Sequence, residues 1–319
     1  MFNILKVILS CIILYFLFKY NILDISLINF NNYNLFNLLL IIFLIFLTIF
    51  FTSLRLYFIL RYFELKLSLR YVFSITYIGY FFNQCLPGGQ GGDLFKAFYL
   101  IKKYPNFKKI KLISYLVLDR MIGLIALIII FSISIYSLNI FFNDLISLGI
   151  ILLLLNLIIV LFFIIFFKLE GFKIIIHKLL LSIYLKTVSE LINKISNYFN
   201  DKAVSLKWVF LLIFISIITF IISIICIILL DDSEMLSVNK IIKIYFVSSV
   251  TFFSNSIPVS FNGLGIGEYV FSKLSNFLFS GNITHYANLF LIYRIIMIIV
   301  SLPGLILFII FKNTRIESK

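Results

Sequence analysis

Apolar runs, too long and too poor in charge for the core of a water-soluble protein, dominate this sequence. A helix that spans a bilayer needs about 20 mostly apolar residues. Such runs lie near residues 4–18, 35–54, 112–138, 145–167, 208–230 and 289–311. Only 13% of the residues are charged, whereas soluble domains average about 25%. With a mean hydropathy of +1.16, the chain is predicted to be an all-α polytopic membrane protein.

Two further apolar segments are interrupted by Pro and Gly. The segment 71–101 is broken by the sequence PGGQGGD at 87–93, and the segment 241–280 is broken between residues 258 and 268. Irregular backbone at membrane depth is tolerated only where protein or a water-filled cavity surrounds it. Both segments are therefore candidates for non-spanning structures.

Charge predicts how these two segments lie in the bilayer. Arg55, Arg61, Lys66 and Arg70 precede the first segment, and five lysines follow it between residues 102 and 111. The second segment has acidic residues before it and the nearly uncharged stretch 281–285 after it. Because cytoplasmic loops carry an excess of Lys and Arg, the first segment should enter and leave from the cytoplasm, and the second from outside.

The resulting prediction is a multi-pass protein of the cytoplasmic membrane with eight apolar segments. About six are full transmembrane helices and two are re-entrant helical hairpins, with both termini in the cytoplasm. The first run, 4–18, lacks a small-residue cleavage site and is interpreted as a retained helix rather than a signal peptide. Residues 1–319 are treated as one transmembrane domain.

The two hairpin segments resemble each other in sequence. FFNQCLP at 81–87 aligns with FFSNSIP at 252–258, and each is followed by a glycine-containing turn and one acid, Asp93 or Glu268. At nearly equal spacing after the acid comes Arg120 or Arg294. One unit is thus hairpin 71–101 with helix 112–138, and the other is hairpin 241–280 with helix 287–311. Since their predicted orientations are opposite, the pattern indicates an inverted-topology repeat, which is common in transporters.

Charged residues inside the predicted membrane segments are the candidate site. They cost about 2.5–3.5 kcal/mol each on insertion scales and are functional candidates by default. Lys243 and Lys273 lie near hairpin ends, where long side chains reach the interface. The predicted substrate-binding residues comprise the other charges and the turn residues beside them: Asp93, Lys96, Asp119, Arg120, Glu268, Arg294, Gly88, Gly89, Gly92, Asn262, Gly263 and Gly265.

Two interpretations of these residues stay open. In one, N–H groups at the half-helix starts and the guanidinium groups of Arg120 and Arg294 hold a phosphate, with glycine allowing close approach. In the other, Asp93 and Glu268 stabilise helix starts, and the arginines neutralise nearby carboxylates as buried pairs. Lys96 fits either.

Several other functions are excluded. The net charge of +14 does not indicate nucleic-acid binding, because most basic residues lie in loops between apolar runs. Three cysteines in apolar stretches and two histidines far apart predict no disulfide framework, metal site or histidine-based catalysis. The glycine run 88–92 lacks the Gly-Lys-Ser/Thr of a P-loop. No cofactor is expected.

The same stretches resemble the lysylphosphatidylglycerol synthase transmembrane family, the flippase-like half of the multiple peptide resistance factor. The resemblance rests on four motifs in order along nearly the whole chain: NQCLPG at 83–88 leading into Gly92 and Asp93, LDRMIGL at 118–124, IPVSFNGLG at 257–265, and YR at 293–294 with LPG at 302–304. The family usually has Arg-Glu-Gly after the Gly-Leu-Gly turn, whereas this chain has Gly267, Glu268 and Tyr269. Any carried-over role that needs a cation beside Glu268 is therefore in question.

The resemblance implies handling of a membrane lipid with an anionic head group, a phospholipid or a polyprenyl-phosphate-linked sugar. In the two-part resistance proteins a separate soluble domain makes the aminoacyl lipid. The longest connection here, about 168–207, is too short for such a domain, so no enzyme activity is expected.

The favoured prediction is a flippase-like translocase that moves such a lipid across the cytoplasmic membrane. Two alternatives stay open. One is a membrane-embedded transferase that uses a lipid-linked sugar and holds a metal at the acidic stretch 231–234. The other is a non-catalytic membrane partner of a separate lipid-modifying enzyme.

Overall fold

The structure is a computed structural model, which describes residues 34–85, 91–139, 205–231, 237–256, 263–279 and 283–313, together with Tyr15, Lys19 and Leu154. Except for Tyr15 and Leu154, the predicted helices 4–18 and 145–167 lie outside the described residues. So do Gly88, Gly89 and Asn262.

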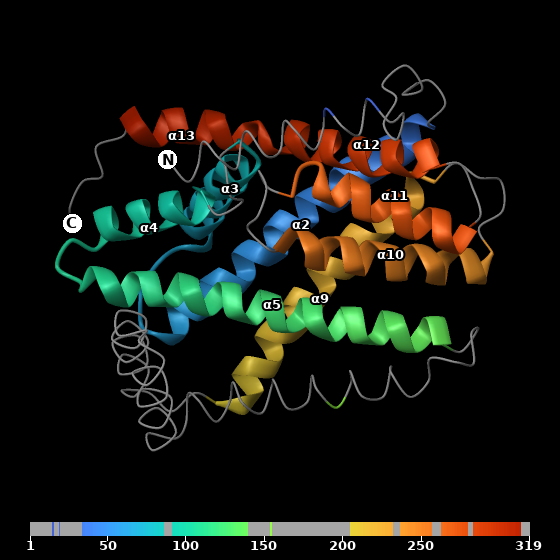
Figure 1. Cartoon of the computed structure of the whole chain (residues 1–319). Coiled ribbons are helices and arrows are strands. Elements are labelled where there is room, and N and C mark those ends of the chain that lie inside the picture. Colours follow the sequence, from blue (N-terminus) through green and yellow to red (C-terminus); the bar gives the residue numbers. More distant parts are fainter. Residues whose placement is uncertain are drawn as a thin grey trace, which may run out of the picture.

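Helices make up nearly all of the described chain (Figure 1). In order they are α2 (Leu35–Tyr62), α3 (Leu69–Cys85), α4 (Gly91–Lys103), α5 (Lys109–Asn139), α9 (Leu206–Leu229), α10 (Val238–Ser256), α11 (Ile266–Phe279), α12 (Ile283–Ser301) and α13 (Pro303–Asn313).

Four helical segments of the described chain are long and apolar enough to cross a membrane: Leu35–Tyr62, Lys109–Leu138, Leu206–Leu229 and His285–Phe311. They correspond to the predicted spans at 35–54, 112–138, 208–230 and 289–311, so the prediction of a polytopic helical membrane protein is confirmed. Side-chain caps begin two of them, since Asn34 accepts from the N–H of Phe36 and Ser205 from that of Trp208. The fourth comprises α12 and α13, which meet at Pro303.

The segments between these spans form two antiparallel helix pairs. In the first, the Tyr71 hydroxyl donates to the carbonyl of Tyr99 (2.9 Å), while at the other end the Gly92 N–H donates to Asn83 Oδ1 (2.8 Å). The start of α3 therefore lies beside the end of α4. In the second pair, Lys243 Nζ near the start of α10 donates to the carbonyl of Leu278 near the end of α11 (2.8 Å).

Glycine permits the close crossing within the first pair. A Cβ on Gly92 would lie 1.8 Å from the carbonyl oxygen of Gly79, so only glycine fits there. In the second pair Gly263 adopts a φ of +74°, and a Cβ there would lie 2.2 Å from Asn255 Oδ1. The turn residues that interrupt the two apolar segments thus allow each pair to close.

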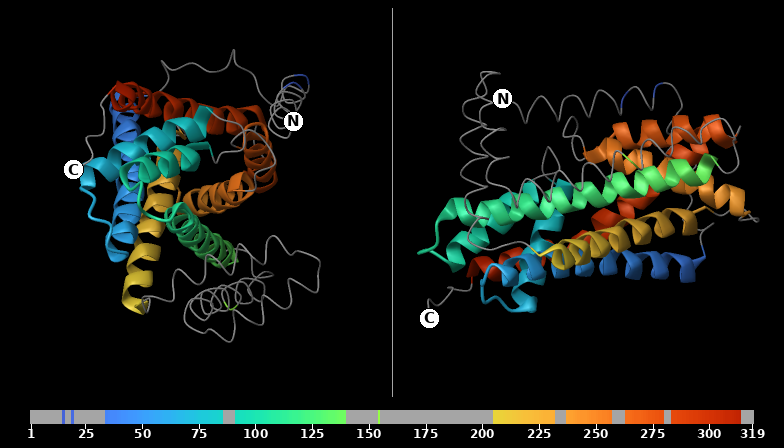
Figure 2. Two further views of the ribbon diagram at one scale, coloured as in Figure 1. Left: turned by 90° about the vertical axis from the view of Figure 1, so that its left-hand side faces the viewer. Right: turned by 90° about the horizontal axis from the view of Figure 1, so that it is seen from below.

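The two pairs lie at opposite ends of the molecule, and each packs against the long helix that follows the other. Figure 1 shows α3 and α4 at one end and α10 and α11 at the other. The Tyr245 hydroxyl of α10 donates to the Ile130 carbonyl of α5 (3.1 Å). Reciprocally, the Tyr77 hydroxyl of α3 donates to the Val300 carbonyl of α12 (2.7 Å). Helices α2 and α9 pack against each other, and the right-hand view of Figure 2 shows them side by side along one edge of the molecule.

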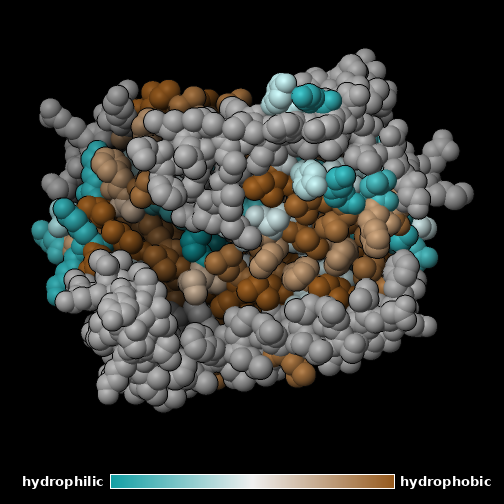
Figure 3. Space-filling model, in the orientation of Figure 1, coloured by the Kyte–Doolittle hydropathy of each residue, from teal (hydrophilic) through white to brown (hydrophobic). Residues whose placement is uncertain are grey.

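Apolar side chains fill the interior and also cover the outer surface. One buried cluster joins α2, α3, α4, α5 and α9, and a second joins α2, α3, α9, α10, α11 and α12. Large apolar side chains nonetheless face outward, among them Leu35 (70% exposed) and Phe214 (61% exposed). Figure 3 shows brown, apolar surface over much of the described part of one face. Such a surface suits lipid rather than water.

Candidate functional site

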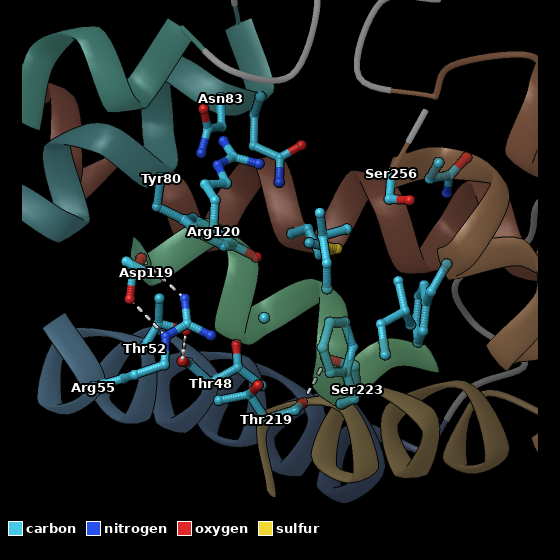
Figure 4. Close-up of a pocket in the computed structure, with 18 of the residues that line it drawn as sticks. Thr48, Thr52, Arg55, Tyr80, Asn83, Asp119, Arg120, Thr219, Ser223 and Ser256 are labelled. Atoms are coloured by element: carbon cyan, nitrogen blue, oxygen red, sulfur yellow. Dashed lines mark hydrogen bonds and ion pairs between the residues drawn. The ribbon is translucent and has the colours of Figure 1, made fainter. Parts of the chain in front are cut away.

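A cavity of about 360 Å³ lies between the two helix pairs. It is lined by residues of α2, α3, α4, α5, α9, α10 and α12, so every described helix except α11 and α13 contributes. Figure 4 shows Thr48, Thr52 and Arg55 reaching it from α2, Tyr80 and Asn83 from α3, and Thr219 and Ser223 from α9. Its charged lining residues are Arg55, Asp93, Lys96, Asp119, Arg120 and Arg294.

At the first helix pair, Asp93 binds two cations. Its carboxylate accepts from Arg120 Nε and lies 3.2 Å from Lys96 Nζ, one turn along α4. Lys96 is buried, whereas the Arg120 side chain keeps 41% of its surface exposed. Arg120 is therefore the cation at this end that a solute in the cavity reaches.

At the second helix pair, Glu268 binds Arg294 in a fully buried arrangement. Arg294 Nε lies 3.1 Å from Glu268 Oε1, and the other carboxylate oxygen accepts from the Gly265 N–H at 2.7 Å. Arg294 Nη2 donates to the Gly263 carbonyl at 3.3 Å. Arg294 Nη1 is buried and has no hydrogen-bond partner among the described residues. Since a buried donor without a partner is costly, this nitrogen is a natural contact for an acceptor in the cavity.

The third ion pair in the cavity wall links Asp119 to Arg55, a residue that the sequence analysis placed in a basic cytoplasmic flank. That placement is wrong, because Arg55 lies inside α2 with only 8% of its surface exposed. Its Nε and Nη2 donate to the two oxygens of Asp119 at 2.6 and 3.0 Å, and its Nη1 donates to Ser216 Oγ at 2.9 Å. The signal that could have revealed it is the apolar stretch 56–60, which extends the helix beyond the predicted end.

The structure brings together most of the predicted site residues. Asp93, Lys96, Asp119, Arg120 and Arg294 all line the cavity, and Glu268 lies behind Arg294. Of the predicted glycines, Gly92, Gly263 and Gly265 shape the two turns and are not part of the lining.

The ion pairs agree with the interpretation of the charges as neutralised partners: Arg120 binds Asp93, and Arg294 binds Glu268. The N–H group of Gly92 donates to the Asn83 side chain, and that of Gly265 donates to the Glu268 carboxylate. Side chains rather than these two N–H groups therefore face the cavity.

The structure also explains why Gly267 can stand where the family motif has arginine. A Cβ on Gly267 would lie 2.9 Å from Arg294 Nη2 and 2.8 Å from Phe290 Cε1. The space beside Glu268 is already occupied, and the cation next to Glu268 is Arg294 from α12.

Positive charge exceeds negative charge around the cavity. Its described walls hold the four cations Arg55, Lys96, Arg120 and Arg294. The carboxylates they meet are those of Asp93, Asp119 and Glu268. Four against three leaves one excess positive charge. An apolar helix bundle that encloses such a cavity suits a ligand with a single negative charge, such as a phosphodiester.

The acidic stretch proposed for a metal does not form a metal site in the part that the structure describes. Asp231 is buried and lies 2.5 Å from Lys240 Nζ, and His285 Nε2 is 3.8 Å from its other oxygen. Residues 232–234 lie outside the described residues. Among those described, no group of three His, Cys, Asp or Glu side chains suits a metal ion.

The fold and this cavity define a multi-pass helical membrane protein with an interior polar site. The sequence profile of the family described as "Lysylphosphatidylglycerol synthase TM region" matches residues 3–304, and the chain belongs to this family. Neither a curated protein nor a solved structure matches the chain at a significant level.

Proposed function

We propose that this protein is a translocase for a lipid with an anionic head group in the cytoplasmic membrane. The observation that carries the proposal is the cavity with one excess positive charge between two oppositely placed helix pairs. The head group would occupy the cavity between Arg120 and Arg294 while the acyl chains stay in lipid. Membership of a family whose description concerns a lipid synthase supports a lipid-related role.

The lengths of the helices support a re-entrant arrangement. Helices α4 and α11 contain 13 and 14 residues, or about 20 Å of helix at 1.5 Å per residue. The hydrocarbon core is about 30 Å thick. Each helix pair would therefore enter from one side of the bilayer and turn near the middle, as in transporters built from inverted repeats. Both termini would be cytoplasmic.

The charges in the cavity give a physical reason for translocation. A bilayer opposes the crossing of a phosphate group because the charge must leave water. A guanidinium binds phosphate with two parallel hydrogen bonds, so Arg120 and Arg294 would replace part of the lost hydration. The substrate is a phospholipid or a polyprenyl-phosphate-linked lipid, and the chain itself would perform no bond chemistry. A separate enzyme would make or use the lipid.

Transport into reconstituted liposomes tests the proposal. Purified protein is inserted into liposomes that carry a labelled anionic phospholipid, or a labelled polyprenyl-phosphate sugar, in one leaflet. We expect wild-type protein to move one of these lipids, and Asp93→Asn and Glu268→Gln each to lower the rate at least tenfold. Glu64→Gln is the matched control, because Glu64 is an exposed carboxylate between α2 and α3, outside the cavity.

Two results would contradict the proposal. Full transport by both neutral variants would remove the assigned site. Folded wild-type protein that moves none of the lipids would instead favour a transferase or a non-catalytic partner, and co-purification with a lipid-modifying enzyme would distinguish the partner.

A further inference from the structure

We propose that Arg55 is a positioning residue of the cavity: by holding Asp119 it fixes the direction in which the neighbouring Arg120 enters. The consequence for transport rests on the proposed function, whereas the geometry stands independently. None of the sequence motifs includes Arg55. It lies in α2, outside both hairpins and the helices that follow them.

The Arg55 guanidinium binds two other helices. Two of its nitrogens bind both oxygens of Asp119 on α5, and the third binds Ser216 on α9. The same group packs against Gly123 of α5, where a Cβ would lie 3.1 Å from Arg55 Nη1. Arg55 therefore joins α2, α5 and α9, and each of its three guanidinium nitrogens donates a hydrogen bond to another helix. Figure 4 shows this contact with its dashed lines at the base of the cavity.

Helix geometry links this contact to Arg120. Consecutive residues on an α-helix point about 100° apart. Asp119 is tied to Arg55 of α2, and Arg120 is tied to Asp93 of α4. Rotation of α5 about its axis would break both contacts at once. Through Arg55, Asp119 thus anchors α5 to α2 and α9, and this anchorage sets the position of Arg120 relative to the hairpin.

The second unit repeats this arrangement with neutral groups. Tyr293, which directly precedes Arg294 on α12, is hydrogen-bonded to Ser223 of α9. Arg294 itself binds Glu268 of α11. In both units one residue holds the long helix to α2 or α9, and the next residue holds it to a hairpin. This recurrence argues that the first contact serves to place the arginine.

Stability alone does not account for an ion pair at this position. Replacing a buried pair by apolar side chains of similar size is often neutral or stabilising, whereas removing one partner is strongly destabilising. The double variant Arg55→Met with Asp119→Leu therefore removes the anchor, preserves net charge and is expected to fold. A change in the cavity of this variant reports the position of Arg120 and not the loss of a charge.

Thiol reactivity in the cavity measures that position. The reporter is Leu124→Cys in a background without the three native cysteines, because Leu124 lines the cavity one turn after Arg120. The measured quantity is the rate of modification by an anionic methanethiosulfonate reagent divided by the rate with a cationic one. Arg120→Gln gives the ratio expected without this cation. We expect the double variant to lower the ratio about fivefold, towards that limit.

Controls separate positioning from general damage. Arg61→Met removes an exposed arginine of the same helix and should leave the ratio unchanged. Arg55→Lys keeps the charge but loses the bidentate hydrogen bond to Asp119, so an intermediate ratio is expected. Thermal unfolding reports whether each variant is folded.

An unchanged ratio in the folded double variant would overturn the proposal. If the double variant does not fold, an unchanged ratio in Arg55→Lys would do the same. The reagent ratio requires no transport, so it still tests Arg55 if wild-type protein moves no lipid. If transport is observed, the double variant should slow it at least fivefold.

Discussion

Arg294 and Arg120 have equivalent positions in the two units but different surroundings. Arg294 and Glu268 are almost wholly inaccessible, with side-chain exposures of 7% and 0%. Arg120 and Asp93 keep 41% and 21%. Water screens an exposed ion pair, whereas removal of one partner of a buried pair leaves an uncompensated charge. Loss of one partner should therefore cost more in the second pair, and the first pair should respond more readily to a ligand.

Neutralising the two carboxylates tests this difference. Glu268→Gln should lower the free energy of unfolding by about 3 kcal/mol, because it leaves the buried Arg294 without its counter-ion. Asp93→Asn should lower it by less, because the half-exposed Arg120 is solvated by water and only the buried Lys96 is left without its counter-ion. Denaturant titration of the purified variants measures both. Equal losses, or a larger loss for Asp93→Asn, would contradict the assignment.

At the scale of elements, tyrosine hydroxyls join each hairpin to the other unit. Tyr77 of α3 donates to Val300, just before the break between α12 and α13. Pro303 has no N–H, so it cannot continue the α-helical ladder, and the Leu302 N–H closes a tighter turn to Ile299 (3.1 Å). Tyr245 of α10 makes the corresponding contact with Ile130 in the middle of α5.

Removal of these hydroxyls should loosen the contact between units. Tyr77→Phe should cost about 1 kcal/mol of unfolding free energy, the usual value for a neutral hydrogen bond. Tyr245→Phe should cost less, because Tyr245 is only partly buried and its bond is longer. Tyr57→Phe is the control, since its hydroxyl partner Arg61 is exposed. A loss for Tyr57→Phe as large as for Tyr77→Phe would argue against a specific link.

At the scale of the whole molecule, the two ends differ in charge. The end formed by the outer ends of α3 and α4 carries exposed Lys66, Arg70, Lys102 and Lys103. The opposite end contains Asp231, with Lys240 and His285 beside it. The positive-inside rule predicts that the first end is cytoplasmic, which would place the outer ends of both helices of a hairpin on one side.

Cysteine labelling tests this topology. In the cysteine-free background, Ser237→Cys and His285→Cys should react with an impermeant maleimide on intact cells, since both positions are exposed at the second end. Lys66→Cys and Lys103→Cys should react only after permeabilisation. Labelling of positions 66 and 103 from opposite sides would show that α3 and α4 cross the bilayer, and the re-entrant arrangement would then be wrong.

Local patterns were sufficient to predict four membrane spans and to single out charged residues that lie close together in the structure. Apolar runs located four spans because their length must match the bilayer, and Pro and Gly located the turns that let the hairpins close. Charged residues are rare in the predicted membrane segments, which made them candidates for a functional site. Of the six charged candidates, all but Glu268 lie in the cavity wall. The choice between anion contacts and ion pairs could not be made, because both use the same residue types.

The sequence by itself determined that the chain is a helical membrane protein with two related interrupted segments, because hydropathy, proline and glycine act over short distances along the chain. Only the tertiary structure decided which charges meet. Arg55 and Asp119 are 64 residues apart, and Arg55 and Ser216 are 161 apart. Their contact depends on how α2, α5 and α9 pack, and packing is set by side-chain shape over the whole bundle.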